Sequence, residues 1–460
     1  MGPPMIFLLF LFKLSFATTV YVSDNGSQKP CGSLSTPCAS ISTVLSDSSV
    51  TNIIIIDVIT TSSSLDLSSI TLNSNISPIQ AEVKVSSTSG ITNTKSLFLN
   101  DIVFTFANSA ITSQFITSAN LSLNHITFTP ELKSITQKTI EFKLLYMTRG
   151  KLEATNLTIE FFTFTNTNTA IFLETYVSAS FTNLSLSSLT MSNRSAICFA
   201  SSTSNVPAEI AINSASIVTL YATNVPALLS CSQPTDWFPV RISLTNASLA
   251  QCTSSFATGG AIRAPLASGG ALSLSDCQFI HCSCSSVSSE TTTRGGGVYV
   301  DAYGDSNRGE DYTVAVSFSL SNCTFRNNYA SIGNDMYFQT GILTKQLSGN
   351  MFHINVDLGF DAVNAIYGIS LDAAASNVGV ETDLVNLLGI TVSASTQTVK
   401  KDSHAGEIAA LVILSVCVVA AVVFLVFLVI KYHNHFNKEV FLVAWESCFT
   451  QCKSDRTNET

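Results

Sequence analysis

The chain has 460 residues, of which 46% are hydrophobic and only 12% charged, and its formal net charge is −9. It holds 31 acidic and 22 basic residues and no basic patch, so the sequence excludes nucleic acid as a partner. Solubility must then come from Ser, Thr, Asn and attached glycans. The chain is too long for one small domain, so internal repeats are the first feature to seek.

A short apolar run, residues 5–12, stands near the N-terminus and is followed by Lys13, Ser15 and Ala17. Such a run is too short to cross a bilayer, and a small-x-small site after it is typical of a cleaved signal peptide. We therefore predict a signal peptide over 1–17 and an extracellular or lumenal ectodomain over 18–390. The protein would reside in the plasma membrane or another membrane of the secretory pathway.

Asn-x-Ser/Thr sequons recur along this predicted ectodomain. They support an exterior location, and each marks a surface position if it carries a glycan. The eight predicted glycosylation sites are Asn25, Asn75, Asn120, Asn156, Asn183, Asn193, Asn246 and Asn322.

A nine-residue pattern recurs in the ectodomain. Its positions 1 and 3 are Leu, Ile or Phe, its position 8 is apolar, and its positions 4 and 5 favour Asn, Asp, Ser and Thr. Alternating apolar residues indicate a half-buried strand, and the polar pair indicates a bend, so each unit reads as strand, bend, strand. The windows begin at residues 97, 121, 157, 184, 210, 242, 272 and 318.

Units of this kind bury their apolar residues only by stacking on neighbouring units. The shortest spacings between windows suit one turn of a parallel β-helix. We predict an all-β, right-handed parallel β-helix (a solenoid), in which Leu99, Leu123, Ile159 and Leu186 form one buried column. A β-sandwich or a propeller is the alternative, but hairpin dipeptides such as Asn-Gly are nearly absent.

Short glycine motifs carry a family resemblance. Residues 259–262 read GGAI, residues 269–272 read GGAL, residues 296–298 read GGV, and residues 325–328 read FRNN. Together with the opening segment at residues 21–41, they resemble the GGA[ILV] and FxxN repeats of polymorphic outer-membrane proteins, within the pectin-lyase-like superfamily. The resemblance covers about residues 20–340 and implies a right-handed parallel β-helix at a cell surface, with adhesion as the expected activity.

Cysteines are frequent in the ectodomain, where disulfides are permitted. Cys31 and Cys38 lie in a loop-like segment and are predicted to form a disulfide that closes the N-terminal end. Two further pairs occupy the same repeat position in successive windows, which predicts proximity and, with it, disulfides; the alternative is that they are small buried apolar residues. These pairs are Cys252 with Cys282 and Cys277 with Cys323.

The densest acidic cluster comprises Asp301, Asp305, Glu310 and Asp311. A calcium or sugar site is one reading, but interleaved Gly, Ser and Asn without fixed ligand spacing favour a solvated loop. No HExxH, GxSxG or P-loop motif is present. The sequence therefore indicates no catalytic residue and no cofactor, and leaves metal binding open.

The C-terminal part carries the second apolar segment. Residues 408–430 are uncharged and long enough to cross a bilayer as one transmembrane α-helix, with a buried core helix as the alternative. Residues 391–407 are polar and lack apolar periodicity, which indicates a juxtamembrane stalk. Residues 431–460 would then form a cytoplasmic tail.

These observations favour a single-pass membrane protein whose ectodomain acts in recognition or adhesion, with glycans or other cells as ligands. A membrane-tethered polysaccharide lyase or hydrolase is the enzymatic alternative, and a structural surface-coat protein is the third reading. The predicted partners are the membrane itself and a glycan or another cell-surface ligand.

Overall fold

The structure is a computed structural model that describes residues 18–28, 30–45, 49–61, 65–66, 71–74, 80–85, 90–107, 114–131, 138–174, 177–200, 208–231, 240–255, 258–266, 269–285, 292–302, 317–340, 352–357, 364–370 and 381–387. The chain divides into two compact units, residues 1–394 and 395–460, and the described residues all belong to the first. The predicted signal peptide, stalk, transmembrane segment 408–430 and tail lie outside the described residues. Within the described residues, no helix combines the length and the apolar character that a membrane span requires.

The described chain is built almost entirely of β-strands, which confirms the predicted all-β class. The two helices with described residues, α1 (Ile41–Leu45) and α3 (Leu384–Leu387), are short. The strands are β1 (Thr18–Ser27), β2 (Val50–Ile55), β3 (Val58–Thr61), β4 (Leu65–Asp66), β5 (Thr71–Ser74), β6 (Ala81–Val85), β7 (Ile91–Phe106), β8 (Ile116–Pro130), β9 (Lys138–Ile140), β10 (Leu145–Met147), β11 (Gly150–Glu160), β12 (Phe162–Phe164), β13 (Ile171–Leu173), β14 (Val177–Met191), β15 (Ile197–Phe199), β16 (Ala208–Ala222), β17 (Leu229–Cys231), β18 (Val240–Ser254), β19 (Ile262–Pro265), β20 (Ala271–Ser275), β21 (Gln278–Ile280), β22 (Ser283–Cys284), β23 (Val298–Ala302), β24 (Ser317–Arg326), β25 (Met336–Thr340), β26 (Phe352–Asp357), β27 (Ile366–Ser370) and β28 (Glu381–Asp383).

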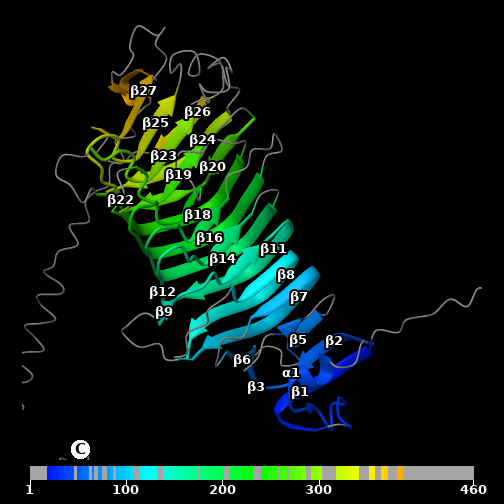
Figure 1. Ribbon diagram of the computed structural model, residues 1–460. Helices are drawn as coiled ribbons and strands as arrows, with labels where there is room; N and C mark the ends of the chain where they lie inside the picture. The colour runs from blue at the N-terminus through cyan, green and yellow to red at the C-terminus, as the bar shows by residue number, and fades with distance from the viewer. Residues whose placement is uncertain are drawn as a thin grey trace, which may run out of the picture. The chain divides into compact units, whose positions relative to one another are not determined.

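Most described strands lie side by side in parallel with a strand that comes later in the chain, usually after one or more intervening strands (Figure 1). The long strands β7, β8, β11, β14, β16 and β18 pair in that order, and β18 pairs next with β20, β21 and β22. The short strands β10, β13, β15, β17, β19, β23, β25 and β27 form a second series in the same order. We call one long strand and the short strands that follow it a layer.

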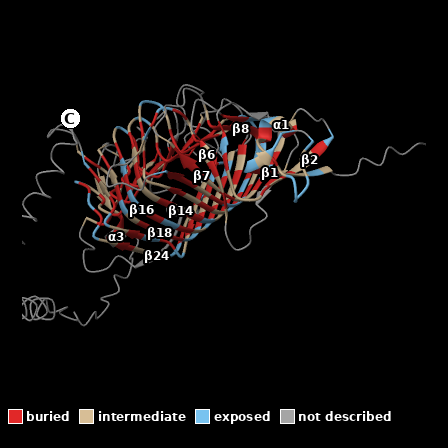
Figure 2. Ribbon diagram, turned by 90° about the horizontal axis from the view of Figure 1, so that it is seen from below, coloured by how far each residue is buried: buried red, intermediate tan, exposed pale blue. Residues whose placement is uncertain are grey.

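Rows of apolar side chains run through the stacked layers and form the core, and two of these rows follow the long strands on either side of a bend. In Figure 2 buried residues recur along the strands from one end of the stack to the other. The first inner row comprises Leu99, Leu123, Ala154, Phe181, Ile212, Leu244, Leu274 and Leu320. The second inner row comprises Phe104, Phe128, Ile159, Leu186, Ile217, Leu249, Phe279 and Phe325. All members of both rows are buried, and like rings stack in the second, with centroids 4.9 Å apart for Phe279 and Phe325.

The predicted single column of Leu99, Leu123, Ile159 and Leu186 is wrong in its register. Leu123 pairs with Ala154, whereas Ile159 and Leu186 lie in the second inner row. The windows at 157 and 184 therefore begin five residues too late. In these two layers the repeat begins at Leu152 and at Ala179. The apolar positions 1, 3, 6, 8 and 11 overlap themselves after a shift of five, so periodicity alone cannot separate the two registers.

Each long strand turns a corner at a residue with positive φ, five positions into the pattern. These residues occupy equivalent places in successive layers, and we call them the bend column: Asp101, His125, Asn156, Asn183, Ser214, Asn246, Asp276 and Asn322, with φ between 52° and 60°. Asn and Asp enter this left-handed conformation more readily than other residues with a side chain. The bend therefore explains why position 5 of the repeat favours Asn and Asp.

At each end of the described stack, one terminal strand is covered. At the N-terminal end, a loop folds against β1, where Tyr21 N donates to Gly32 O and Ser27 N to Pro37 O, at 3.0 and 2.8 Å. A disulfide between Cys31 and Cys38 closes that loop. At the C-terminal end, β28 pairs antiparallel with β27, the one antiparallel pairing among the described strands.

Candidate functional site

A row of side chains along the short strands faces away from the core. The second residue of a short strand is the middle one of three and faces away from its two neighbours, as in β10, where Tyr146 stands between buried Leu145 and Met147. Parallel pairing aligns these middle residues from layer to layer. We call them the outer row: Tyr146, Phe172, Cys198, Ser230, Arg263, Tyr299, Tyr337 and Tyr367.

The first half of the outer row carries a cluster of aromatic and charged groups, which we call the Tyr146 cluster: Lys143, Tyr146, Phe172, Glu174 and Arg194. The rings of Tyr146 and Phe172 stack with centroids 5.7 Å apart. Lys143 Nζ lies 4.6 Å and 4.4 Å from the two centroids, and Arg194 Cζ lies 4.5 Å from that of Phe172. Cations over ring faces are favourable contacts, worth about 0.5–2 kcal/mol each.

A carboxylate completes this cluster. The Tyr146 hydroxyl donates to Glu174 Oε1 at 2.7 Å. Burial, with the carboxylate of Glu174 next to the hydroxyl, raises the pKa of Tyr146 to about 12, so the phenol stays protonated at neutral pH. Burial lowers the pKa of Lys143. The cluster thus combines ring faces, two basic groups and one acceptor, and its charged side chains are only half-buried.

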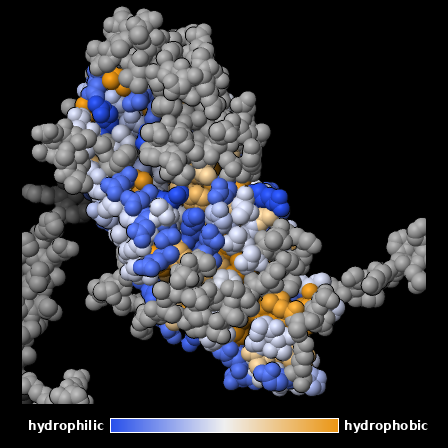
Figure 3. Space-filling view, in the orientation of Figure 1, coloured by the Kyte–Doolittle hydropathy of each residue, from blue (hydrophilic) through white to orange (hydrophobic). Residues whose placement is uncertain are grey.

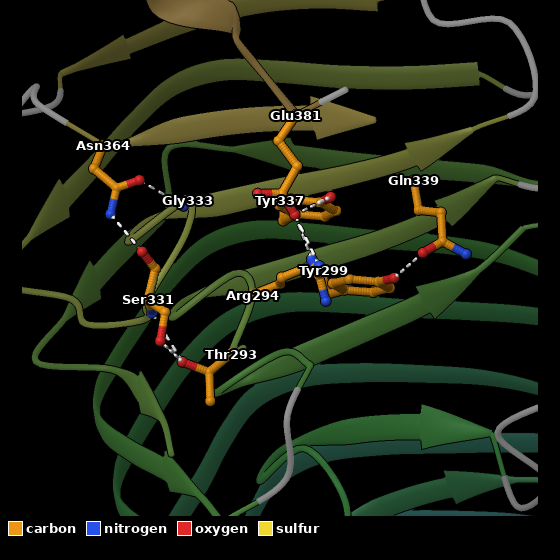
Figure 4. A network of polar contacts seen from close by, with 9 residues as sticks. All are labelled: Thr293, Arg294, Tyr299, Ser331, Gly333, Tyr337, Gln339, Asn364 and Glu381. Carbon is orange, nitrogen blue, oxygen red and sulfur yellow. Dashed lines mark hydrogen bonds and ion pairs between the residues drawn. The ribbon is translucent and has the colours of Figure 1, made fainter. Parts of the chain in front are cut away.

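The second half of the outer row carries a different network (Figure 4). The rings of Tyr299 and Tyr337 stack at 5.5 Å, and Tyr299 donates to Gln339 Oε1 at 2.6 Å. Arg294 Nε donates to Glu381 Oε1 at 2.8 Å, and the Tyr337 hydroxyl donates to the same oxygen at 3.1 Å. Glu381 belongs to β28, so this network ties the antiparallel end strand to the two preceding layers.

The two clusters differ in how much of their side-chain surface is exposed to a ligand. Tyr299 and Tyr337 are buried, and the polar atoms of Figure 4 are directed at one another. In the Tyr146 cluster, Lys143, Tyr146, Glu174 and Arg194 all keep part of their surface exposed. The face seen in Figure 3 is mainly hydrophilic where it is described, with small apolar patches between the polar groups. We therefore take the Tyr146 cluster as the candidate site and the second network as structural.

The acidic cluster of the sequence is only partly described. Asp301 is buried, and its Oδ2 lies 3.0 Å from Arg263 Nη2. Asp305, Glu310 and Asp311 lie outside the described residues. Over the part of the chain that the structure describes, no group of three or more His, Cys, Asp or Glu is arranged to hold a metal ion.

The predicted cysteine pairs are neighbours without a bond. Cys277 and Cys323 occupy equivalent places in adjacent layers, where Thr324 N donates to Cys277 O at 2.8 Å. Cys252 and Cys282 do so as well, beside the pairing of Thr253 with Ser283. All four are buried free thiols, so the predicted disulfides between them do not form in this structure. The predicted bond between Cys31 and Cys38 is present.

The buried thiols should resist modification. Burial raises the pKa of Cys198 to about 11 and that of Cys284 to about 12. At pH 8 we expect iodoacetamide to alkylate them at least ~100-fold more slowly in the folded than in the unfolded protein, because the thiolate is the nucleophile.

The folded state holds these protons more tightly, so the free energy of unfolding should fall as the pH rises from about 9 to about 11. Peptide mass spectrometry and urea unfolding would measure the two effects, and alkylation at equal rates would contradict the first.

The predicted glycosylation sites lie at the surface wherever they are described. Asn25, Asn120, Asn183, Asn193, Asn246 and Asn322 are exposed, and Asn156 is half-buried. Asn75 lies outside the described residues.

Sequence reasoning missed the outer row. Its strands span three to five residues, too few for a periodicity to stand out. A signal does exist, since the segments LYM, IFL, ICF, VYV and MYF each place one outward residue between two apolar ones. The alignment of these segments can be predicted only when the number of residues in each layer is known. The same holds for the approach of Lys143 and Arg194 to the rings.

Comparison with known proteins adds no relative. No family model matches the chain, and no curated protein or solved structure matches it.

Proposed function

We propose that this chain is a single-pass membrane surface protein whose ectodomain, a right-handed parallel β-helix, recognises glycans through the Tyr146 cluster. Partly exposed Tyr146, which contacts Lys143 and Glu174 and stacks on the ring that lies under Arg194, carries the proposal. The apolar face of a sugar ring packs on an aromatic side chain, and its hydroxyls bond to charged groups. Because the cluster holds two cations and one anion, it favours a sugar that bears a carboxylate or a sulfate.

Recognition fits this geometry better than catalysis does. Glycoside hydrolysis uses a pair of carboxylates on either side of the scissile bond. In the described part of the Tyr146 cluster Glu174 is the one carboxylate, and the carboxylate of Asp301 is buried against Arg263. The repeated layers present the cluster on an extended rigid surface, which suits binding to a polymer or to another cell.

Binding to a glycan panel tests this proposal. We expect Lys143→Ala and Arg194→Ala each to weaken binding of an acidic glycan about tenfold or more, because each removes a charge-assisted contact. The matched control is Arg241→Ala, which removes an exposed cation elsewhere, 3.3 Å from Glu209. Equal binding by all variants would exclude the cluster as the site. Turnover of a bound polysaccharide would favour an enzyme instead.

A further inference from the structure

Four of the sequons lie in the bend column and therefore form one line along the stack. Asn156, Asn183, Asn246 and Asn322 all occupy it, with φ between 52° and 56°. The residue after each is buried, and the next is an outward Ser or Thr of the strand. A bend that favours Asn, followed by an outward Ser or Thr two positions later, produces a sequon in four of the eight layers of the bend column. The four acceptor sites therefore share one edge of the stack.

Their spacing along this edge is uneven. Asn183, Asn246 and Asn322 are separated by one intervening layer each, with Ser214 and Asp276 between them. Two layers correspond to about 9.6 Å at the usual strand spacing. Asn156 lies in the layer directly next to Asn183, about 4.8 Å away by the same spacing.

Asn156 also differs in its contacts. Its Oδ1 accepts a hydrogen bond from Asn183 Nδ2 at 2.9 Å, and it is half-buried whereas the other three are exposed. Asn322 Nδ2 donates in the same way to Asp276 Oδ1, at 2.7 Å. A glycan on Nδ2 replaces one of its two hydrogens, so Asn183 and Asn322 can carry a glycan and still donate the remaining one.

We infer that this edge is a glycan-bearing ridge, with N-glycans on Asn183, Asn246 and Asn322 and with Asn156 left largely unmodified. The inference rests on the export of the ectodomain that the proposed function includes. In the transfer, Nδ2 bonds to sugar C1 and loses a proton, while the bond from C1 to the pyrophosphate of a lipid-linked oligosaccharide breaks and the lipid pyrophosphate leaves. Two branched glycans one strand spacing apart would compete for the same volume, which disfavours a fold that carries both.

Site-by-site occupancy tests the ridge in the full-length protein made in a eukaryotic secretory cell. Enzymatic deglycosylation in ¹⁸O-water converts each occupied Asn to labelled Asp, which peptide mass spectrometry quantifies. We expect high occupancy at Asn183, Asn246 and Asn322, and occupancy at Asn156 lower by about fivefold or more. Equal occupancy at Asn156 and Asn183 would overturn the inference.

Two matched variants test whether crowding by a glycan on Asn183 keeps Asn156 unmodified. Ser185→Ala abolishes the sequon of Asn183 but keeps that side chain and its bond to Asn156, so occupancy at Asn156 should rise several-fold. Ser248→Ala removes the sequon of Asn246, which is not adjacent, and should leave Asn156 unchanged. No rise in Ser185→Ala would contradict the crowding argument.

The remaining sequons separate this inference from the proposed function. Glycans on Asn25, Asn120 or Asn193 with a vacant bend column would sink the ridge and leave export intact. The absence of glycans from every sequon would refute export, and with it both proposals. Glycan binding by the Lys143→Ala and Arg194→Ala variants is measured separately, so the ridge and the binding site can fail independently.

Discussion

Leu123→Asp should abolish the folded structure of the layers around β8. Leu123 is 1% exposed and lies in the first inner row between Leu99 and Ala154. Loss of a buried leucine together with burial of a carboxyl group should cost about 5 kcal/mol or more, which is comparable to the whole stability of many domains. Loss of the β-type circular dichroism signal and retention of the protein inside the cell would measure it.

The neighbouring Asn124→Asp is the matched control. Asn124 is exposed, so the same carboxylate at that position stays in water and should change the free energy of unfolding by less than about 0.5 kcal/mol. Secretion of Leu123→Asp at the level of Asn124→Asp, with its circular dichroism unchanged, would contradict the inner row.

Asp301→Asn should be the most destabilising change on the outer face of the short strands. The side chain of Asp301 is 2% exposed and that of Arg263 is 13% exposed, with 3.0 Å between Oδ2 and Nη2. Removing one charge leaves the guanidinium of Arg263 buried without its counter-charge, which should cost about 3–5 kcal/mol. The free energy of unfolding in urea is the measurement.

A paired replacement distinguishes the lost charge from lost packing. Arg263→Met combined with Asp301→Leu removes both charges and keeps apolar volume, so it should recover most of the stability that Asp301→Asn loses. If the double variant is as unstable as Asp301→Asn, the ion pair is not the cause.

Much of the β architecture could be predicted from periodicity because the stacked rows repeat the same chemistry. The windows at 121, 210, 242, 272 and 318 align in the structure as they do in the sequence, since their first and third residues are large and apolar. At Ala154 and Ala179 the inner position is small, and the pattern there looks stronger five residues later. Ala154 is buried between Leu123 and Phe181 of the neighbouring layers, which satisfies packing but gives no signal in the sequence.

The candidate site could not be predicted from periodicity, for a different reason. Tyr146, Phe172 and Arg194 follow one another at intervals of 26 and 22 residues, and only the number of residues in each layer makes them neighbours. That number varies from layer to layer. The proximity of the cysteines could be predicted, because Cys277 and Cys323 share a position in two windows whose register is correct. Whether such neighbours form a bond depends on side-chain geometry that the register does not contain.

The covered strands β1 and β27 also bear on how the protein behaves at high local concentration. A parallel stack has an open strand edge at each end, and the last strand of one molecule is a template for the first strand of another. The loop closed by Cys31 and Cys38 bonds to backbone groups of Tyr21 and Ser27 in β1, while β28 reverses the strand direction against β27. At high local concentration, these covered strands therefore do not act as templates for end-to-end joining of molecules into fibres.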